Sequence, residues 1–105
     1  MSQNTQNFAD PIIVRADVEV QSDGTEAFLA ALREFIAEVL ATEPCDSFEI
    51  FSDEEVGTKF FLVEKWRSKA YYLSRHQSAP HLQKLYAAVG PLLAGPPQFT
   101  FWDAH

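Results

Sequence analysis

The stretch Thr58–Trp66 (TKFFLVEKW) constrains the fold most, because it alternates as a strand does and is largely apolar on both faces. One face would present Phe60, Leu62, Glu64 and Trp66, and the other Phe61, Val63 and Lys65. A strand with two apolar faces needs cover on both of them, so it belongs in a sheet that is packed on each side. The rest of the chain has to supply that cover.

The segments around this strand carry patterns of their own. Ile12–Val20 alternates apolar and polar residues, which predicts a strand with one buried face. Apolar residues recur at helical spacing from Glu26 to Ala41, and Glu43-Pro44 ends this helix because proline disfavours helix at the residue before it. The remaining predicted elements are a strand over Cys45–Phe51, helices over Ser68–Arg75 and from Pro80 to about Val89, and a last strand over Gln98–Trp102.

The elements follow the order strand, helix, strand, strand, helix, strand, with the second helix in two pieces. This order predicts an α+β, ferredoxin-like fold: an antiparallel four-stranded sheet with helices on one face. Since the helices cover only one face, the apolar residues of the other face would meet water in a monomer, which soluble monomers rarely tolerate. We therefore expect a homodimer joined through the sheet face, a dimeric α+β barrel.

The composition limits the partners that the protein can have. A formal net charge of −7 repels the phosphate backbone of nucleic acids and anionic membrane surfaces. The one cysteine, Cys45, can form neither an internal disulfide nor a cysteine-based metal site, which favours the cytoplasm. No stretch is apolar for long enough to cross a membrane, and the N-terminus lacks a signal-peptide pattern. We expect a flexible or partner-contacting tail over residues 1–10 and a single domain over residues 11–105.

Ionisable and aromatic side chains are concentrated between Phe60 and His81. An imidazole has an ordinary pKa of about 6.5, so His76 is suited to accept a proton from a bound substrate at neutral pH. His81 begins a helix, where a neutral, hydrogen-bonding imidazole is favoured. These residues predict a pocket that binds a small aromatic molecule and moves a proton. The residues expected to contact the substrate are His81, Trp66, Tyr72, Tyr86 and Glu64.

Each of these residues also has a structural interpretation. His76 could instead cap the end of its short helix, and the indoles could belong to the core or to the dimer interface. Glu64 shares a face with apolar residues, so its carboxylate needs a partner such as an imidazole or a backbone amide, and a structural hydrogen bond is favoured over direct catalysis. The two histidines are separated by a helix break with no third ligand nearby, which argues against a metal site.

With this order of elements, the chain resembles the antibiotic biosynthesis monooxygenase (ABM) superfamily over about residues 12–102. The features that carry the resemblance are the opening strand, the Glu43-Pro44 helix end before FEIF, the E-x-W strand end of Glu64 and Trp66, the H-x4-H segment of His76 and His81 around Pro80, and the ending from Gly90-Pro91 to Pro97. The resemblance implies a cofactor-independent oxygenase of electron-rich phenols or quinols, with a pocket between the sheet and the helices of each subunit. In such an enzyme the substrate loses a proton and then reduces dioxygen itself, so the protein supplies shape, a base and hydrogen bonds.

One branch of the superfamily degrades haem with an Asn on the first strand, a Trp on the helix after the third strand and a His on the next helix. The matching positions of this sequence hold Arg15, Ala16 and Asp17 on the strand, Arg75 near the Trp position, and Leu85 where the His would be. This departure argues against haem degradation.

Three functions remain open. The first is a dimeric, cofactor-free monooxygenase of a small aromatic or quinol-type metabolite, with His76 as the proton acceptor. The second is an isomerase or other proton-shuttling enzyme acting on a small carbonyl compound, with a smaller and wetter pocket. The third is a non-catalytic dimeric ligand-binding protein, which a cavity filled by Phe and Leu side chains would favour.

Overall fold

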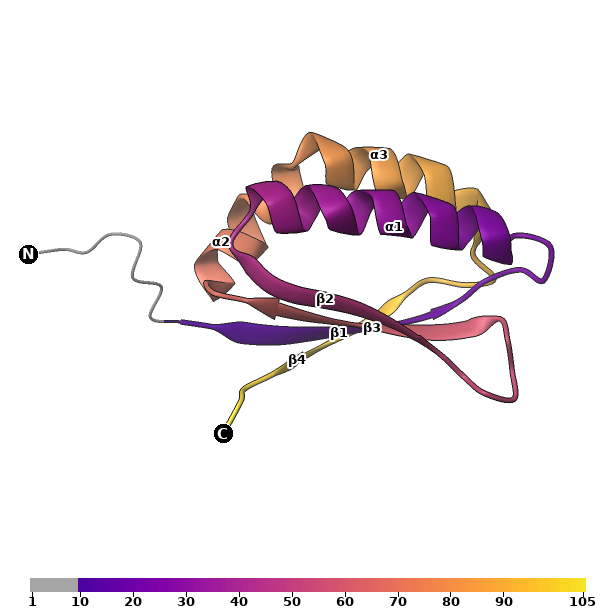
Figure 1. Ribbon diagram of the computed structural model, residues 1–105, viewed down its shortest axis with the longest axis horizontal. Helices are drawn as coiled ribbons and strands as arrows, with labels where there is room; N and C mark the ends of the chain where they lie inside the picture. The colour runs from indigo at the N-terminus through magenta and orange to yellow at the C-terminus, as the bar shows by residue number, and fades with distance from the viewer. Residues whose placement is uncertain (1–9) are drawn as a thin grey trace, which may run out of the picture.

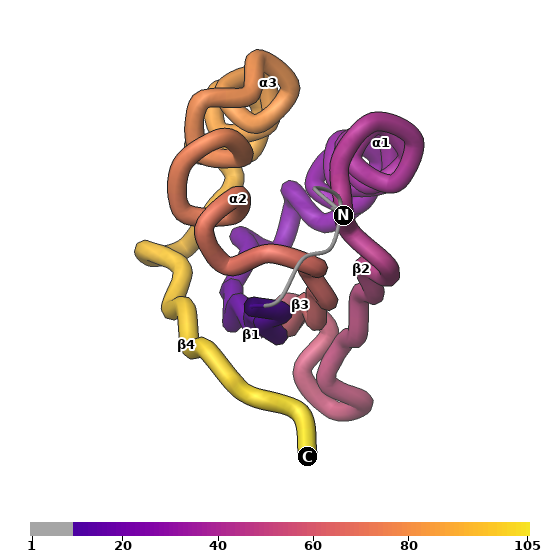
Figure 2. The backbone as a smooth tube through the Cα atoms, turned by 90° about the vertical axis from the view of Figure 1, so that its left-hand side faces the viewer, coloured from indigo at the N-terminus to yellow at the C-terminus, as the bar shows by residue number. Residues whose placement is uncertain are grey.

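The computed structural model describes residues 10–105 and consists of a sheet covered on one face by helices (Figure 1). The strands β1 (Ile12–Glu19), β2 (Cys45–Ser52), β3 (Lys59–Trp66) and β4 (Gln98–Trp102) form one antiparallel sheet in the order β2-β3-β1-β4. The helices are α1 (Thr25–Thr42), α2 (Lys69–Ser74) and α3 (Pro80–Val89), with the short 3-10 helices η1 (His76–Ser78) and η2 (Gly90–Leu92). Helices α1 and α3 lie side by side over the sheet (Figure 2). The predicted ferredoxin-like α+β fold is confirmed.

Strand β3 lies between β2 and β1, and its side chains divide between the two faces as the sequence predicted. Phe60, Leu62, Glu64 and Trp66 point toward the helices and are buried. On the other face Phe61 and Val63 are only half-buried and Lys65 is exposed. The alternation follows from the two-residue period of a strand, which sends successive side chains to opposite faces.

Helix α1 covers the sheet with one apolar side. Its buried residues recur every three or four positions, as a helix with one buried face requires: Phe28, Leu32, Phe35 and Val39. The helix ends at Glu43, whose backbone N–H still donates to the Val39 carbonyl at 2.9 Å. Glu43 itself has extended backbone, the conformation that the following Pro44 favours.

Helix α2 begins at a well-capped end. The Tyr71 N–H donates to the Ser68 hydroxyl at 3.1 Å, so Ser68 is the N-cap of this helix. The backbone carbonyl of Asp10 accepts from the Lys69 N–H at 2.7 Å, and its carboxylate accepts from the Ala70 N–H at 3.1 Å. Residues 1–9 of the predicted tail lie outside the described residues. Asp10, the last residue of that tail, is therefore hydrogen-bonded to the domain.

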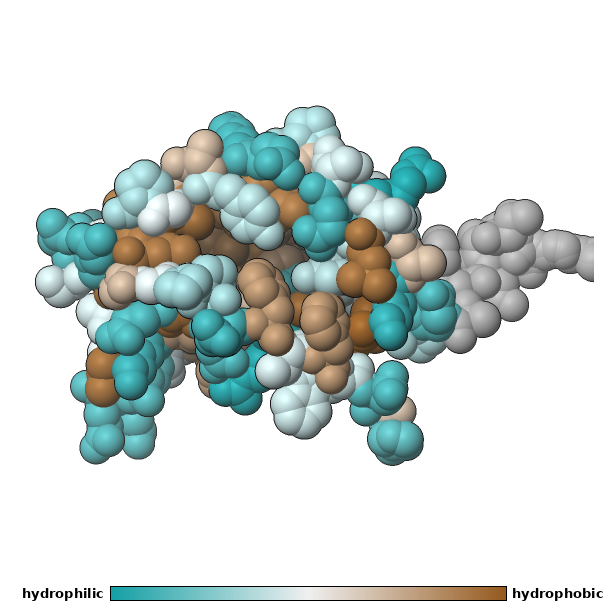
Figure 3. All heavy atoms as spheres, turned by 180° about the vertical axis from the view of Figure 1, so that it is seen from behind, coloured by the Kyte–Doolittle hydropathy of each residue, from teal (hydrophilic) through white to brown (hydrophobic). Residues whose placement is uncertain are grey.

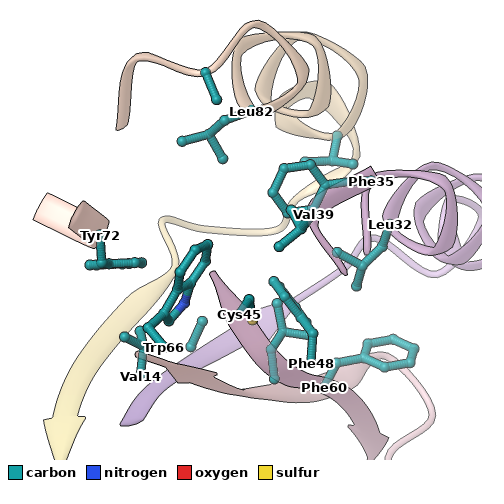
Figure 4. Close-up of a cluster of buried hydrophobic side chains, with 14 of the residues drawn as sticks. Val14, Leu32, Phe35, Val39, Cys45, Phe48, Phe60, Trp66, Tyr72 and Leu82 are labelled. Atoms are coloured by element: carbon teal, nitrogen blue, oxygen red, sulfur yellow. The ribbon is translucent and has the colours of Figure 1, made fainter. Parts of the chain in front are cut away.

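The core fills the space between the inner face of the sheet and the helices (Figure 4). Its largest fully buried side chain is Trp66, which is 1% exposed at the end of β3. Phe28 packs against Phe60 at 5.2 Å between ring centroids, and Phe35 meets Phe48 edge to face at 5.9 Å. Within residues 10–105 the structure contains no helix whose length and apolar character would suit a membrane span.

Candidate active site

A cavity of about 370 Å³ lies between the inner face of the sheet and the helices α1 and α3. Figure 3 shows the hollow as a brown, hydrophobic patch that more hydrophilic residues surround. The phenyl rings and aliphatic chains of its wall come from all four strands of the sheet and from both long helices. The polar side chains that line the cavity are Glu64, Tyr72, His76, Gln77 and Tyr86.

His76 lies in η1 and is buried instead of capping the surface end of α2. Its Nδ1 is 3.0 Å from Oε1 and 3.2 Å from Oε2 of Glu43. A carboxylate accepts hydrogen bonds, so Nδ1 is the protonated ring nitrogen and donates a hydrogen bond to Glu43. The other ring nitrogen, Nε2, has no hydrogen-bond partner within residues 10–105, so its lone pair is available to a ligand.

The environment of His76 keeps its imidazole neutral. Burial lowers the pKa of His76 below its ordinary value, and the hydrogen bond to Glu43 only partly opposes this effect. The ring packs between aromatic neighbours, with centroids 4.4 Å from Trp66 and 5.4 Å from the stacked Tyr72. A neutral imidazole with a fixed tautomer is the form that can accept a proton.

Glu43 is the residue of this site that sequence reasoning missed, since Glu43-Pro44 was interpreted only as the end of a helix. Its side chain is 3% exposed and connects both histidines, because Oε2 is also 2.6 Å from Nε2 of His81. One signal could have revealed it: a carboxylate at a helix C-terminus is disfavoured by the helix dipole and needs cationic or hydrogen-bonding partners. The imidazoles of His76 and His81 are those partners.

His81 lies in the first turn of α3 and does not line the cavity. It lines a smaller cleft of about 160 Å³ between α1 and α3, together with Glu34, Glu38 and Lys84. The structure therefore brings His81 to Glu43, on the side of this carboxylate that is nearer to solvent. Its predicted contact with substrate stays a prediction that this geometry does not support.

Trp66 and Glu64 form a buried pair on the inner face of β3. The indole Nε1–H donates to Glu64 Oε1 at 2.9 Å, so the partner of this carboxyl is neither an imidazole nor a backbone amide. Trp66 does not line the cavity, whereas Glu64 does, and Glu64 is only 4% exposed. Burial raises the pKa of Glu64 to about 7; the indole hydrogen bond opposes this rise, and the charge of Glu43 adds to it.

The two cavity tyrosines lie at different depths. Tyr72 is buried and packs on Trp66, with ring centroids 5.4 Å apart, whereas Tyr86 is 46% exposed. Burial raises the pKa of both phenols, and the charge of Glu64 raises them further. Both tyrosines therefore stay neutral at physiological pH and can donate hydrogen bonds to a ligand.

The structure thus joins four of the predicted residues in one cavity: His76, Glu64, Tyr72 and Tyr86. Trp66 lies outside the cavity and donates a hydrogen bond to Glu64. Glu43 accepts from Nδ1 of His76 and is also hydrogen-bonded to His81. No group of three or more His, Cys, Asp or Glu residues within the described part of the chain is arranged to hold a metal ion. The arrangement can bind an apolar, oxygen-bearing molecule and transfer a proton to or from it.

The comparisons with known proteins identify the family and the fold of the chain. The family model of the antibiotic biosynthesis monooxygenases matches residues 11–88. A solved protein from Caulobacter crescentus CB15, which carries this family name provisionally, is 25% identical, with a TM-score of 0.84 and with 94% of this chain and 93% of that chain covered. Rv0793 from Mycobacterium tuberculosis is 28% identical, with a TM-score of 0.81 and coverage of 91% and 96%.

A protein from Nitrosomonas europaea is 20% identical, with a TM-score of 0.83 and coverage of 97% and 95%, and it shows the fold alone. The search of curated proteins found no match. Since the family model covers well over half of the sequence, the chain belongs to the antibiotic biosynthesis monooxygenase family.

Proposed function

We propose that the protein is a cofactor-independent monooxygenase of a small aromatic or quinol-type molecule, with His76 as the base. The observation that carries this proposal is the state of the His76 imidazole. Its Nδ1–H is held by Glu43 at 3.0 Å, and its Nε2 has no partner within residues 10–105. A buried, neutral imidazole with a free nitrogen is suited to take the proton of a phenol or of an activated C–H group.

The lining of the cavity supports an aromatic substrate. Its volume of about 370 Å³ is within the usual range of small-molecule pockets, about 300–1,000 Å³. Its wall is almost entirely apolar, with aromatic rings contributed by Phe28, Phe35, Phe48 and Phe99. Packing against such rings stabilises the binding of flat apolar molecules, and the few polar groups of the cavity orient the oxygen-bearing end of the ligand.

The proposed reaction balances without an added reductant. For an anthrone-type substrate, the methylene carbon loses one proton to His76, and the carbanion that remains donates electrons to dioxygen. One oxygen atom becomes the new carbonyl of the product, and the other leaves as water together with both methylene hydrogens. The substrate supplies all four electrons, so the chain has to provide only a base and a dry, shaped site.

We expect His76→Ala to lower the rate of dioxygen uptake by about 10²–10⁴-fold, the usual contribution of a positioned base. Uptake would be measured with an oxygen electrode on a panel of quinols and anthrones, using full-length protein. His105→Ala is the matched control, because His105 is exposed at the C-terminus, and it should leave the rate unchanged. Uptake by the wild type that survives in His76→Ala would refute the role of His76, and no uptake with any substrate would refute the oxygenase.

We also propose that the protein works as a homodimer joined through the outer face of the sheet. This face carries Phe51 stacked on Phe61 at 4.9 Å between centroids, beside Val63, Ile13 and an exposed Trp102. Arg15, which lies over the Phe61 ring at 4.2 Å, is paired with Asp17 and so adds no free charge. A face of this kind is more stable against a second copy of itself than in water.

We expect Phe61→Asp to convert this dimer to a monomer and to weaken association by at least about 100-fold, because it places an unpaired charge in the interface. Sedimentation equilibrium across a range of concentrations would measure the change. Val56→Asp puts the same charge on an exposed apolar residue of the β2–β3 loop and should leave the dimer intact. A wild type that sediments as a monomer at high concentration would disprove the interface.

A second function, the isomerase of a small carbonyl compound, is favoured by one observation. Glu64 and His76 line the same cavity, so two groups that exchange protons are within reach of one ligand. Such a pair can remove a proton next to a carbonyl and deliver one to the carbonyl oxygen. Solvent deuterium entering a bound ketone without oxygen consumption would support the isomerase, and neither activity would leave a ligand-binding protein.

A further inference from the structure

Glu64 is the one carboxyl among the described residues that line the cavity, and its two oxygens are in different surroundings. Oε1 accepts the Trp66 indole N–H at 2.9 Å, whereas Oε2 has no hydrogen-bond partner within residues 10–105. The same indole lies against the His76 ring at 4.4 Å between centroids. Glu64 and His76 therefore both contact the Trp66 indole and both line the cavity.

The groups around Glu64 favour its uncharged form. The titratable groups that face it are Glu43 at the end of α1, Cys45 on β2, Tyr72 on α2, His76 on η1 and Tyr86 on α3. None of these carries a positive charge at neutral pH, and no lysine or arginine of the described residues lines the cavity. A carboxylate removed from water with a single neutral donor pays a large desolvation cost, which a proton removes.

A protonated Glu64 offers an O–H donor where a ligand oxygen would lie. The Trp66 indole N–H already donates to Oε1, so the proton belongs on Oε2, the oxygen without a partner among residues 10–105. A donor of this kind, buried in an apolar site, stabilises negative charge that develops on a nearby oxygen. It does so without losing its own proton.

We propose that Glu64 is a catalytic carboxylic acid that donates a hydrogen bond from Oε2 to the oxygen of a phenol or enol, while His76 accepts a proton from the same ligand. For a phenol, the O–H bond breaks, its proton moves to His76 Nε2, and the electron pair stays on the oxygen, which accepts from Glu64. For an anthrone or ketone, the C–H bond breaks and the charge moves to the carbonyl oxygen, which again accepts from Glu64. The effect of Glu64 on turnover rests on the proposed function. Its hydrogen bond to the ligand does not, because that bond forms on binding, before any reaction.

Glu64 and His76 together select the class of ligand that the cavity binds. An oxygen that is both a hydrogen-bond donor and an acceptor satisfies Glu64 and His76 together, as the hydroxyl of a phenol or enol does. An aromatic hydrocarbon of the same shape satisfies neither group and leaves both polar atoms unpaired. Above the pKa of Glu64, the carboxylate also repels an anionic ligand.

The first test measures the affinity of the wild type for 1-naphthol and for naphthalene by calorimetry, at about pH 6 and about pH 8. With a Glu64 pKa of about 7, the protonated fraction falls about tenfold between these values, so 1-naphthol should bind about tenfold more weakly at the higher pH. Tyr72, Tyr86 and Cys45 all have raised pKa values and stay protonated, and His76, with a lowered pKa, stays neutral. Naphthalene should show no dependence on pH.

Glu64→Gln and Glu54→Gln are the variants of this test. The amide of Glu64→Gln donates at every pH, so the affinity for 1-naphthol should become independent of pH. Glu54→Gln, on an exposed loop residue, should retain the tenfold change. A wild-type affinity for 1-naphthol that does not change with pH, or a preference for naphthalene at pH 6, would overturn the inference.

Infrared spectroscopy tests the protonation of the same group in the absence of a ligand. The wild type should show the C=O stretching band of a protonated carboxyl that disappears with a midpoint near pH 7, and Glu64→Gln should lack it. A midpoint below about pH 5, as for an ordinary glutamate, would overturn the inference. If the binding and infrared results are as expected but dioxygen uptake is absent, only the monooxygenase is refuted; if uptake depends on His76 and the midpoint is ordinary, only the role of Glu64 is refuted.

Discussion

Trp66→Ala is expected to lower the free energy of unfolding by about 3–5 kcal/mol, the usual cost of removing a buried tryptophan side chain. Trp66 is 1% exposed and packs against His76 and Tyr72, so its removal opens a large void at the end of β3. The change also removes the only hydrogen-bond donor of Glu64 among the described residues, which adds the cost of a buried unpaired polar group. Urea denaturation monitored by circular dichroism would measure the difference.

Trp102→Ala is the matched control for this prediction, since Trp102 is the other tryptophan and is 55% exposed at the end of β4. We expect it to change the free energy of unfolding by less than about 1 kcal/mol. A loss in Trp102→Ala that shrinks as the protein is diluted would come from the proposed dimer interface instead of the core, because both proteins are monomers at low concentration. If Trp66→Ala were as stable as the wild type, the packing of this indole would not be what holds β3 to α2 and η1.

Glu43→Ala is expected to cost about 2–4 kcal/mol of folding free energy, because each buried donor that loses its acceptor costs about 1–3 kcal/mol. Its carboxylate is the hydrogen-bond partner of His76 at 3.0 Å and of His81 at 2.6 Å. The substitution leaves both imidazoles without that acceptor and disconnects the end of α1 from η1 and α3. Denaturation experiments would measure the loss, and the His76 tautomer, observed by nitrogen NMR, should become mixed.

Two substitutions serve as controls for Glu43→Ala. Glu43→Gln keeps an oxygen that accepts from His76 and an amide that can donate to His81, so its cost should be smaller by about 2 kcal/mol. Glu34→Ala removes an exposed glutamate of the same helix, whose ion pair with Lys84 at 3.3 Å contributes about 1 kcal/mol at most. Equal losses in Glu43→Ala and Glu34→Ala would show that the buried contacts of Glu43 do not stabilise the fold.

The fold could be predicted from the sequence because its signals are local. The alternation of Ile12–Val20 and Thr58–Trp66 predicts strands and even their buried faces, since side chains alternate along every strand. Glu43-Pro44 and Ser68 mark helix boundaries through backbone preferences that do not depend on the rest of the chain. The order of the elements then leaves few ways to arrange one sheet and its helices.

The candidate site could be predicted only in part from the sequence, because local signals reveal unusual residues but not their neighbours in the fold. Glu64 and His76 could be chosen because an ionisable side chain on an apolar strand face or beside a turn is unusual by itself. The neighbouring elements decide whether such a residue faces a cavity or the packed core. Trp66 therefore lies outside the cavity and hydrogen-bonds to Glu64, and His81 lines another cleft.

The sequence by itself therefore determined the elements, their order and the presence of ionisable groups near the end of β3. Only the tertiary structure decided which of these groups meet: Glu43 contacts two histidines that are 33 and 38 residues away along the chain. Such contacts depend on how α1 and α3 pack across the sheet, and no local pattern records that packing. The hydrogen bonds that orient His76, and the burial that raises the pKa of Glu64 to about 7, exist only once these helices close over β3.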